Sequence, residues 1–242
     1  MRFAIIVLVI VVAALAPAEQ LKTQTDIDGH DSAVDYQWQP AKEIVVKWLQ
    51  LPDFTLLALS SEYMTDFDYW MECADDFYCD DGSPIVALEW WGIDWTNTVI
   101  DYFVVRFYTD VPDGRFSHPG DLLYEGTIDS WVATYLPDPD AVHYEADLPV
   151  SFQQQAGNIY WVSIQAYHSY LVGGGQWFWS QCLPSEYWND EATARSEYHG
   201  FPDWTNMTAA LGYYAEMAFV LYADVTSPVE DTTWAGIKAL YK

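Results

Sequence analysis

Carboxylates are the most abundant groups in this sequence that could perform chemistry. Aspartate and glutamate number 36, against 9 lysines and arginines. Glycoside hydrolases need only two acids held roughly 5 to 10 Å apart. Glu89 is the best single candidate, because the adjacent Trp90 and Trp91 could raise the pKa of its carboxyl as a general acid requires. The alternative, which the large number of acids favours, is that Glu89 simply faces solvent on an alternating strand.

Four aspartates form a second cluster with chemical potential. Asp75, Asp76, Asp80 and Asp81 fall within seven residues around a short apolar run. Carboxylate oxygens at this density are suitable ligands for a structural Ca²⁺ ion at the edge of a β-sandwich. The spacing of an EF-hand is missing, so a solvated acidic loop is the alternative.

Aromatic residues are the strongest anomaly, with 13 tryptophans and 18 tyrosines. In the runs Trp90-Trp91 and Trp177-Phe178-Trp179, strand alternation places neighbours on opposite faces. Flat exposed rings flanked by acids and amides are typical of sites that stack sugar rings. We therefore predict a polysaccharide-binding platform of Trp90, Trp91, Trp95, Trp177 and Trp179. The alternative is that a two-layer sandwich with long loops buries both faces, since tryptophan is highly buried on average.

The common catalytic signatures are missing from the sequence. It contains no Gly-x-Ser-x-Gly, no His-Glu-x-x-His and no phosphate-binding loop. The five histidines occur at no metal-binding spacing, and Gly173-Gly174-Gly175 is interpreted as a strand connection. We therefore assign no catalytic residue and predict a protein that is not an enzyme.

The N-terminus has the pattern of a secretory signal peptide. Arg2 precedes an apolar run over residues 3–16, and Ala16-Pro17-Ala18 supplies small residues before a cleavage site after Ala18. A membrane anchor is the alternative, but about 20 apolar residues are needed to span a bilayer as a helix. The sequence therefore predicts a secreted or cell-surface protein with no stable membrane span after cleavage.

Export has consequences for the cysteines. Disulfides persist outside the cytoplasm, so one pair among Cys73, Cys79 and Cys182 is expected, with one thiol left over. The sequence leaves open whether Cys73 joins Cys79 within a loop or Cys79 joins Cys182 between strands.

The charge of the mature chain restricts its partners. Cleavage removes Arg2 and leaves 8 basic against 36 acidic residues, a formal charge of −28. Nucleic acid is excluded as a partner, because phosphate binding requires clustered lysine and arginine. Anionic lipid surfaces are disfavoured for the same reason.

The remaining pattern predicts a single all-β domain. Residues 19–42 are polar with little periodicity and are expected to form a flexible leader. Over residues 43–224, short β-branched and aromatic runs alternate with Pro, Gly, Asp and Asn clusters, as in the strand 142–150. We predict a two-sheet antiparallel β-sandwich of about ten strands, with a jelly-roll order first and an immunoglobulin-like order second. Residues 225–242 are expected to form a C-terminal tail with a short helix, and the alternative is a final helix that caps the sandwich.

Several short motifs occur in an order that resembles a family of uncharacterised secreted bacterial domains. They are Ala74-Asp75-Asp76-Phe77, Pro84-Ile85, Trp90-Trp91-Gly92, Thr109-Asp110-Val111-Pro112 and His118-Pro119-Gly120. The segment 234–242 is similar to a short C-terminal motif, WxxIKxxYK, of exported proteins from diderm bacteria. The resemblance implies an exported β-sandwich and brings no activity with it.

Three functions follow as hypotheses from these observations. The first is a secreted non-catalytic binding or cell-surface module, whose partner is a polysaccharide or another cell-surface component. The second is a structural protein of the envelope or matrix, and the third is an extracellular glycoside hydrolase with paired carboxylates.

Overall fold

The computed structural model describes residues 43–96, 98–114, 116–137 and 140–225. The predicted signal peptide, the leader and all of the tail except Val225 lie outside the described residues. Within those ranges, no helix has the length and apolar character needed to cross a membrane.

Strands make up most of the described chain. In order, the elements are β1 (Ile44–Gln50), β2 (Leu59–Ser60), β3 (Glu62–Met64), β4 (Tyr69–Cys79), β5 (Ile85–Trp95), β6 (Ile100–Asp113), β7 (Phe116–Ile128), β8 (Val132–Tyr135), β9 (Ala141–Phe152), β10 (Asn158–His168), β11 (Gln176–Trp179), a 3₁₀ turn (Pro184–Glu186), β12 (Thr193–Ser196), β13 (Phe201–Asn206), α1 (Met207–Leu211) and β14 (Phe219–Asp224). Asn206 caps α1 through its side chain, and Gly212 ends it in a left-handed conformation.

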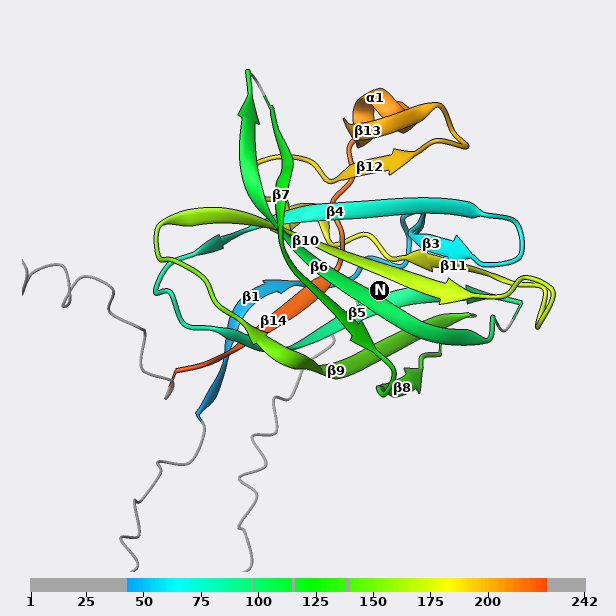
Figure 1. The fold of residues 1–242 in the computed structure, drawn as a ribbon, viewed down its shortest axis with the longest axis horizontal. Helices are drawn as coiled ribbons and strands as arrows, with labels where there is room; N and C mark the ends of the chain where they lie inside the picture. The colour runs from blue at the N-terminus through cyan, green and yellow to red at the C-terminus, as the bar shows by residue number, and fades with distance from the viewer. Residues whose placement is uncertain (1–42, 97, 115, 138–139, 226–242) are drawn as a thin grey trace, which may run out of the picture. The chain divides into compact units, whose positions relative to one another are not determined.

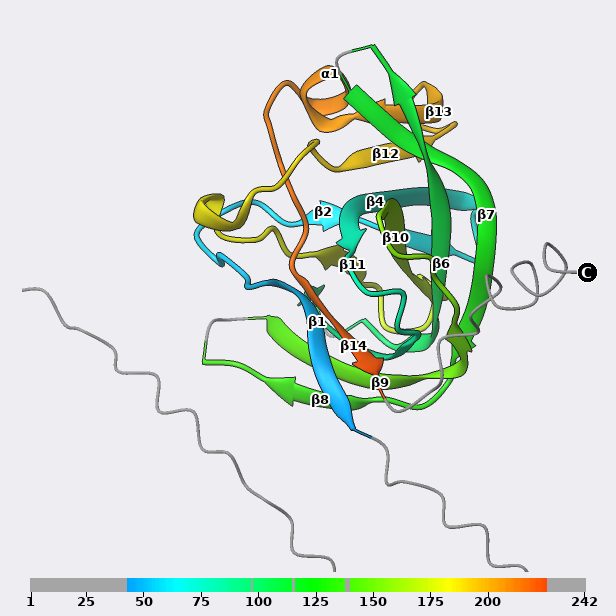
Figure 2. The same ribbon diagram turned by 90° about the vertical axis from the view of Figure 1, so that its left-hand side faces the viewer.

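The strands form two seven-stranded sheets packed face to face (Figures 1 and 2). In the first sheet, β5 is flanked on one side by β9 and on the other by β14 and then β11. Strand β1 borders β14, β2 borders β11, and β8 borders β9. The second sheet has the order β13-β12-β4-β3-β10-β6-β7, with β4 also pairing directly with β10.

Eight of these strands form a jelly roll, which confirms the first topology predicted. The first sheet contains β1-β14-β5-β9 and the second contains β4-β10-β6-β7. Counted along this frame alone, the orders are first-eighth-third-sixth and second-seventh-fourth-fifth, which is the order of a jelly roll. The β2–β3 segment is inserted between the first two frame strands, and β11 to α1 between the last two.

One pair departs from the predicted antiparallel arrangement. Strand β3 runs parallel to β10, with Glu62 opposite Ala166. A short turn connects β3 to β4, and β4 is antiparallel to both β3 and β10. Since β3 and β10 both run antiparallel to β4, they run in the same direction as each other.

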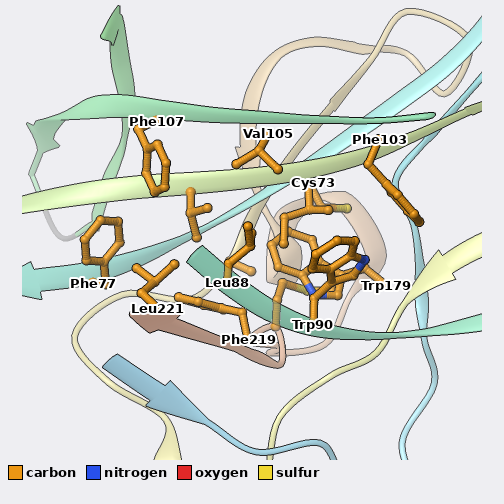
Figure 3. Close-up of a cluster of buried hydrophobic side chains, with 14 of the residues drawn as sticks. Cys73, Phe77, Leu88, Trp90, Phe103, Val105, Phe107, Trp179, Phe219 and Leu221 are labelled. Atoms are coloured by element: carbon orange, nitrogen blue, oxygen red, sulfur yellow. The ribbon is translucent and has the colours of Figure 1, made fainter. Parts of the chain in front are cut away.

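The core lies between the sheets and is rich in aromatic rings (Figure 3). Alternation along β6 points Phe103, Val105 and Phe107 inward, and all three are fully buried. Trp90 of β5 stacks on Tyr144 at 5.4 Å between ring centroids and meets the edge of Phe103 at 4.9 Å. These offset and edge-on contacts are the geometries that aromatic pairs prefer.

Strand β4 is 11 residues long although acids interrupt its apolar pattern. Its first half contains Glu72 and Asp75, so the sequence there has the pattern of a polar segment although the strand is buried. Both acids are buried because hydrogen bonds satisfy them: Glu72 accepts from two arginines, and Asp75 accepts from the backbone N–H of Met217 at 2.6 Å.

Candidate functional site

The predicted tryptophan platform is wrong for three of its five members. Trp90, Trp177 and Trp179 are fully buried between the sheets. Trp177 packs over Gly92, where an added Cβ would lie 2.5 Å from the indole nitrogen, so this glycine makes room for the ring. The alternative, in which the sandwich buries these rings, is therefore correct.

The other two members lie on the outside of the first sheet or at its end. Trp91 points outward but is only 8% exposed, because it stacks on His143 at 4.8 Å and packs with Cys182 and Val220. Trp95 ends β5 opposite Gln176 of β11 and is 53% exposed. Of the five predicted rings, only Trp95 is available to a ligand.

Exposed aromatic side chains instead surround a hollow at one end of the sandwich. This aromatic hollow has a volume of about 550 Å³ and is lined by Met64, Phe67, Asp68, Tyr69, Tyr170, Gln176, Tyr198 and His199. Its walls come from the β3–β4 turn, the β10–β11 connection and the β12–β13 turn. In Figure 1 the first two of these lie together at the right-hand end. The volume falls within the ordinary range of ligand sites.

The rings around the hollow pack edge-to-face and leave much of their surface open. Phe67 meets Tyr170 at 5.7 Å and 62°, and Tyr69 meets Tyr198 at 5.1 Å and 72°. Phe67 is 57% exposed and Tyr198 76% exposed. The hydroxyl of Tyr69 is hydrogen-bonded to Nε2 of His199 at 3.0 Å. The arrangement offers flat apolar surface with polar atoms at its border.

Hydrogen bonds that Asp66 accepts hold two of the walls together. Its Oδ2 accepts from the Ser169 hydroxyl at 2.7 Å and from the Leu171 N–H at 2.9 Å. These donors lower the pKa of Asp66, because they favour its charged form. Gly174 adopts φ +71°, which lets the connection turn back so that its N–H bonds the Tyr170 carbonyl.

Below the hollow, Gln176 reaches a buried polar cluster. Its Nε2 donates to Oε1 of Glu62 at 3.3 Å. Oε2 of Glu62 is 2.8 Å from Nε2 of His168 and accepts from the Trp177 N–H at 2.7 Å. Glu62 and His168 are both fully buried. This cluster limits the movement of the Gln176 amide, which leaves it oriented at the edge of the hollow.

The four aspartates predicted to bind calcium do not come together. Asp75 and Asp76 are buried on opposite faces of β4, where Asp75 accepts from Met217 and Asp76 from Asn189. Asp81 is paired with Lys47, and Asp80 lies 3.7 Å from the same ammonium group. Among the described residues, no group of three or more acids, histidines or cysteines is arranged to hold a metal ion.

Burial strongly raises the pKa values of Asp75 and of two acids near it. It raises the pKa of Asp76 to about 8 and that of Glu216 to about 7, and it raises the pKa of Asp75 well above its usual value. Oxygens of Glu216 accept from Gln50 at 2.9 Å and from the Trp188 N–H at 2.8 Å. Desolvation is the main cause in each case, since it penalises the charged form.

The three cysteines are free and buried, so the expected disulfide is not formed. Cys73 and Cys79 occupy different positions along β4, opposite Ala194 and Asn158 respectively. Cys182 forms an isolated backbone β-bridge with Pro52 and packs in the cluster that contains Trp91, outside the first sheet. Burial raises the pKa of Cys73 and of Cys182, which keeps these thiols protonated and unreactive.

Glu89 lies on the outer face of the first sheet beside a histidine. Its Oε2 is 2.9 Å from Nε2 of His143, and its Oε1 accepts from the Tyr222 hydroxyl. The hydrogen bond from His143 is the largest of the causes that lower the pKa of Glu89, whereas a general acid needs a raised pKa. The tryptophan argument failed because Trp90 points to the other face and Trp91 stacks on His143.

Sequence reasoning missed the residues of the aromatic hollow because it sought rings on strands. Phe67 lies in the segment Thr65-Asp66-Phe67-Asp68, and Tyr198 lies just before His199-Gly200. Both segments have the Asp and Gly residues of turns. An aromatic residue inside a turn signal has no strand face to bury it, and this signal could have identified both residues.

Comparison with known proteins identifies a family model that covers most of the sandwich. A family model described as "Domain of unknown function (DUF7901)" matches residues 46–222, from within β1 to within β14. No curated protein matches the chain.

Proposed function

We propose that this chain, which belongs to the family described as Domain of unknown function (DUF7901), is an exported, non-catalytic module. It binds polysaccharide in the aromatic hollow. The observation that carries this proposal is the group of exposed rings around a hollow of about 550 Å³. Sugar rings place their apolar C–H faces on aromatic surfaces, and their hydroxyls bond nearby amides and carboxylates. Gln176, Asp68 and His199 supply such groups.

The origin of the walls supports a binding role. All three belong to segments inserted into the eight-stranded frame, which the frame itself does not need. Loops positioned by a rigid scaffold are the usual location of binding residues. The hydrogen bonds of Asp66 and Gln176 hold these segments in place before a ligand arrives, which reduces the entropic cost of binding.

Affinity electrophoresis tests the proposal. The protein is run through gels containing single soluble neutral polysaccharides, together with the variants Phe67→Ala and Tyr198→Ala. One polysaccharide should retard the unsubstituted protein. Each variant should bind that polysaccharide with roughly tenfold lower affinity, equivalent to about 1.4 kcal/mol. Tyr135→Ala is the matched control, because the exposure of Tyr135, 70%, lies between those of Phe67 and Tyr198, but Tyr135 lies on β8 outside the hollow. Uniform mobility across the panel, or equal loss in all three variants, would contradict the proposal.

A second candidate function is self-association, favoured by the edges of the first sheet. Edge strand β1 exposes Ile44, Val46 and Leu49, and β8 exposes Val132 and Tyr135. Exposed apolar edges can pair with another chain, and lysine substitutions block such pairing. Sedimentation velocity at increasing concentration would reveal assembly, which Val46→Lys and Val132→Lys should abolish. A monomer at all concentrations would remove this candidate.

A further inference from the structure

The outer face of the second sheet carries a separate hollow that contains most of the described positive charge. The hollow has a volume of about 320 Å³ and lies over β4, β6, β10 and β12, between Trp70, Glu72, Arg106, Gln165, Tyr167 and Arg195. The described residues include one lysine and two arginines. The lysine, Lys47, is already paired with Asp80 and Asp81. The other two, Arg106 and Arg195, meet in this hollow.

Glu72 holds the two guanidinium groups in place from below. It is only 3% exposed. Its Oε2 accepts from Nε and Nη2 of Arg195 at 3.0 and 2.7 Å. Its Oε1 accepts from Tyr108 at 2.7 Å, from Ser163 at 2.8 Å and from Nη1 of Arg106 at 3.3 Å. Five donors therefore surround one carboxylate, and both arginines have fixed orientations.

Such a network is more than strand pairing requires. A buried ion pair costs desolvation, and apolar side chains of similar size often stabilise a protein equally well. The network leaves one group unused, since Nη1 of Arg195 has no acceptor among the described residues. The Arg195 side chain is 34% exposed, and its guanidinium lies 4.5 Å from the centre of the Trp204 ring. A partly exposed guanidinium that is held in a fixed orientation is well suited to bind a carboxylate.

A carboxylate of the protein already occupies the rim. Glu125 accepts from Nε of Arg106 at 2.7 Å, and its side chain is 52% exposed. Its position shows that a partly exposed carboxylate can reach Arg106. Beside the two arginines, Tyr167 supplies a hydroxyl and Trp70 supplies a ring, whereas the Gln165 amide is buried and bonded to Arg106 and to the Met71 carbonyl. A second hollow of about 300 Å³, which includes His118 and Trp204, shares Arg195.

We propose that this outer-face hollow binds a carboxylated sugar, with the uronate carboxylate on Arg195 and the sugar ring beside Trp70. Because Arg195 lines both hollows, two consecutive sugar units contact it from its two sides. This site is independent of the aromatic hollow and does not rest on the function proposed for it.

Isothermal titration calorimetry with digalacturonate and its methyl ester tests this proposal. The ester keeps the rings and removes the charge. Digalacturonate should bind at least tenfold more tightly than the ester, because only a carboxylate can form charge-assisted hydrogen bonds with the guanidinium of Arg195. Equal affinity for the two probes, or binding of neither, would overturn the proposal.

Variants locate the site and separate it from the aromatic hollow. Arg195→Lys should weaken digalacturonate binding at least fivefold, because an ammonium group lacks the planar fork of a guanidinium. Glu125→Gln removes a negative charge beside Arg106 that repels the uronate, and it should strengthen binding severalfold without disturbing Glu72. Tyr198→Ala should leave it unchanged. A Glu125→Gln variant that binds no better, or a Tyr198→Ala variant that loses binding, would refute the assignment to this face.

Discussion

Replacing Asp76 by asparagine should change how the stability of this domain depends on pH. Burial raises the pKa of Asp76 to about 8 in the folded protein. In an unfolded chain the pKa of an aspartate is about 3.9. Between these two values the folded protein holds a proton that the unfolded chain has released. The free energy of unfolding therefore falls as the pH rises through this window.

The size of the effect follows from the two pKa values. Each pH unit inside the window costs about 1.4 kcal/mol. From pH 5 to pH 8, and allowing for the flattening near the folded-state pKa, Asp76 lowers the free energy of unfolding by roughly 3 to 4 kcal/mol. Asparagine has no proton to lose and keeps an oxygen that can accept from Asn189, so this cost disappears in the variant.

Urea unfolding at pH 5, 6, 7 and 8 measures this difference. The stability of Asp76→Asn relative to the unsubstituted protein should rise by roughly 3 to 4 kcal/mol across the series. Asp75 and Glu216 also have raised pKa values and remain in the variant. Because the charge of Asp76 contributes to the raised pKa of Asp75, removing that charge changes the difference in the same direction. Asp80→Asn is the control, because the Asp80 side chain is 73% exposed. Parallel pH profiles for Asp76→Asn and the unsubstituted protein would refute the reasoning.

Three further predictions concern the core, the thiols and metal binding. Trp177→Ala should lower the free energy of unfolding by about 3 to 5 kcal/mol, because it leaves a large cavity, whereas the exposed Trp95→Ala should change it by less than about 1 kcal/mol in the same urea experiment. Reducing agent should leave the Tm unchanged, and thiol titration should detect all three cysteines only after denaturation; a Tm lowered by reduction would indicate a disulfide. Calcium or a chelator should leave the Tm unchanged, since the four candidate aspartates have protein partners, and a calcium-dependent rise in Tm would contradict this.

Strand periodicity predicted much of the frame because alternation is a local property. The inward residues of β6 and β9 are spaced two apart, so a two-faced strand is evident without knowledge of its neighbours. The same argument failed in the first half of β4. There Glu72 and Asp75 become buried only through donors from β6, β12 and the segment before β14, which are distant in the sequence.

By itself, the sequence determined an acidic all-β sandwich with two-faced strands, because composition and alternation act residue by residue. Only the tertiary structure decided which faces are covered. Trp90 and Trp91 point to opposite sides of β5, yet both are buried, since Phe54 and Tyr187 pack over the outer cluster that contains Trp91. The aromatic hollow likewise exists only because three separate turns meet at one end of the jelly roll. Contacts between residues far apart in the chain depend on topology, and no local pattern specifies them.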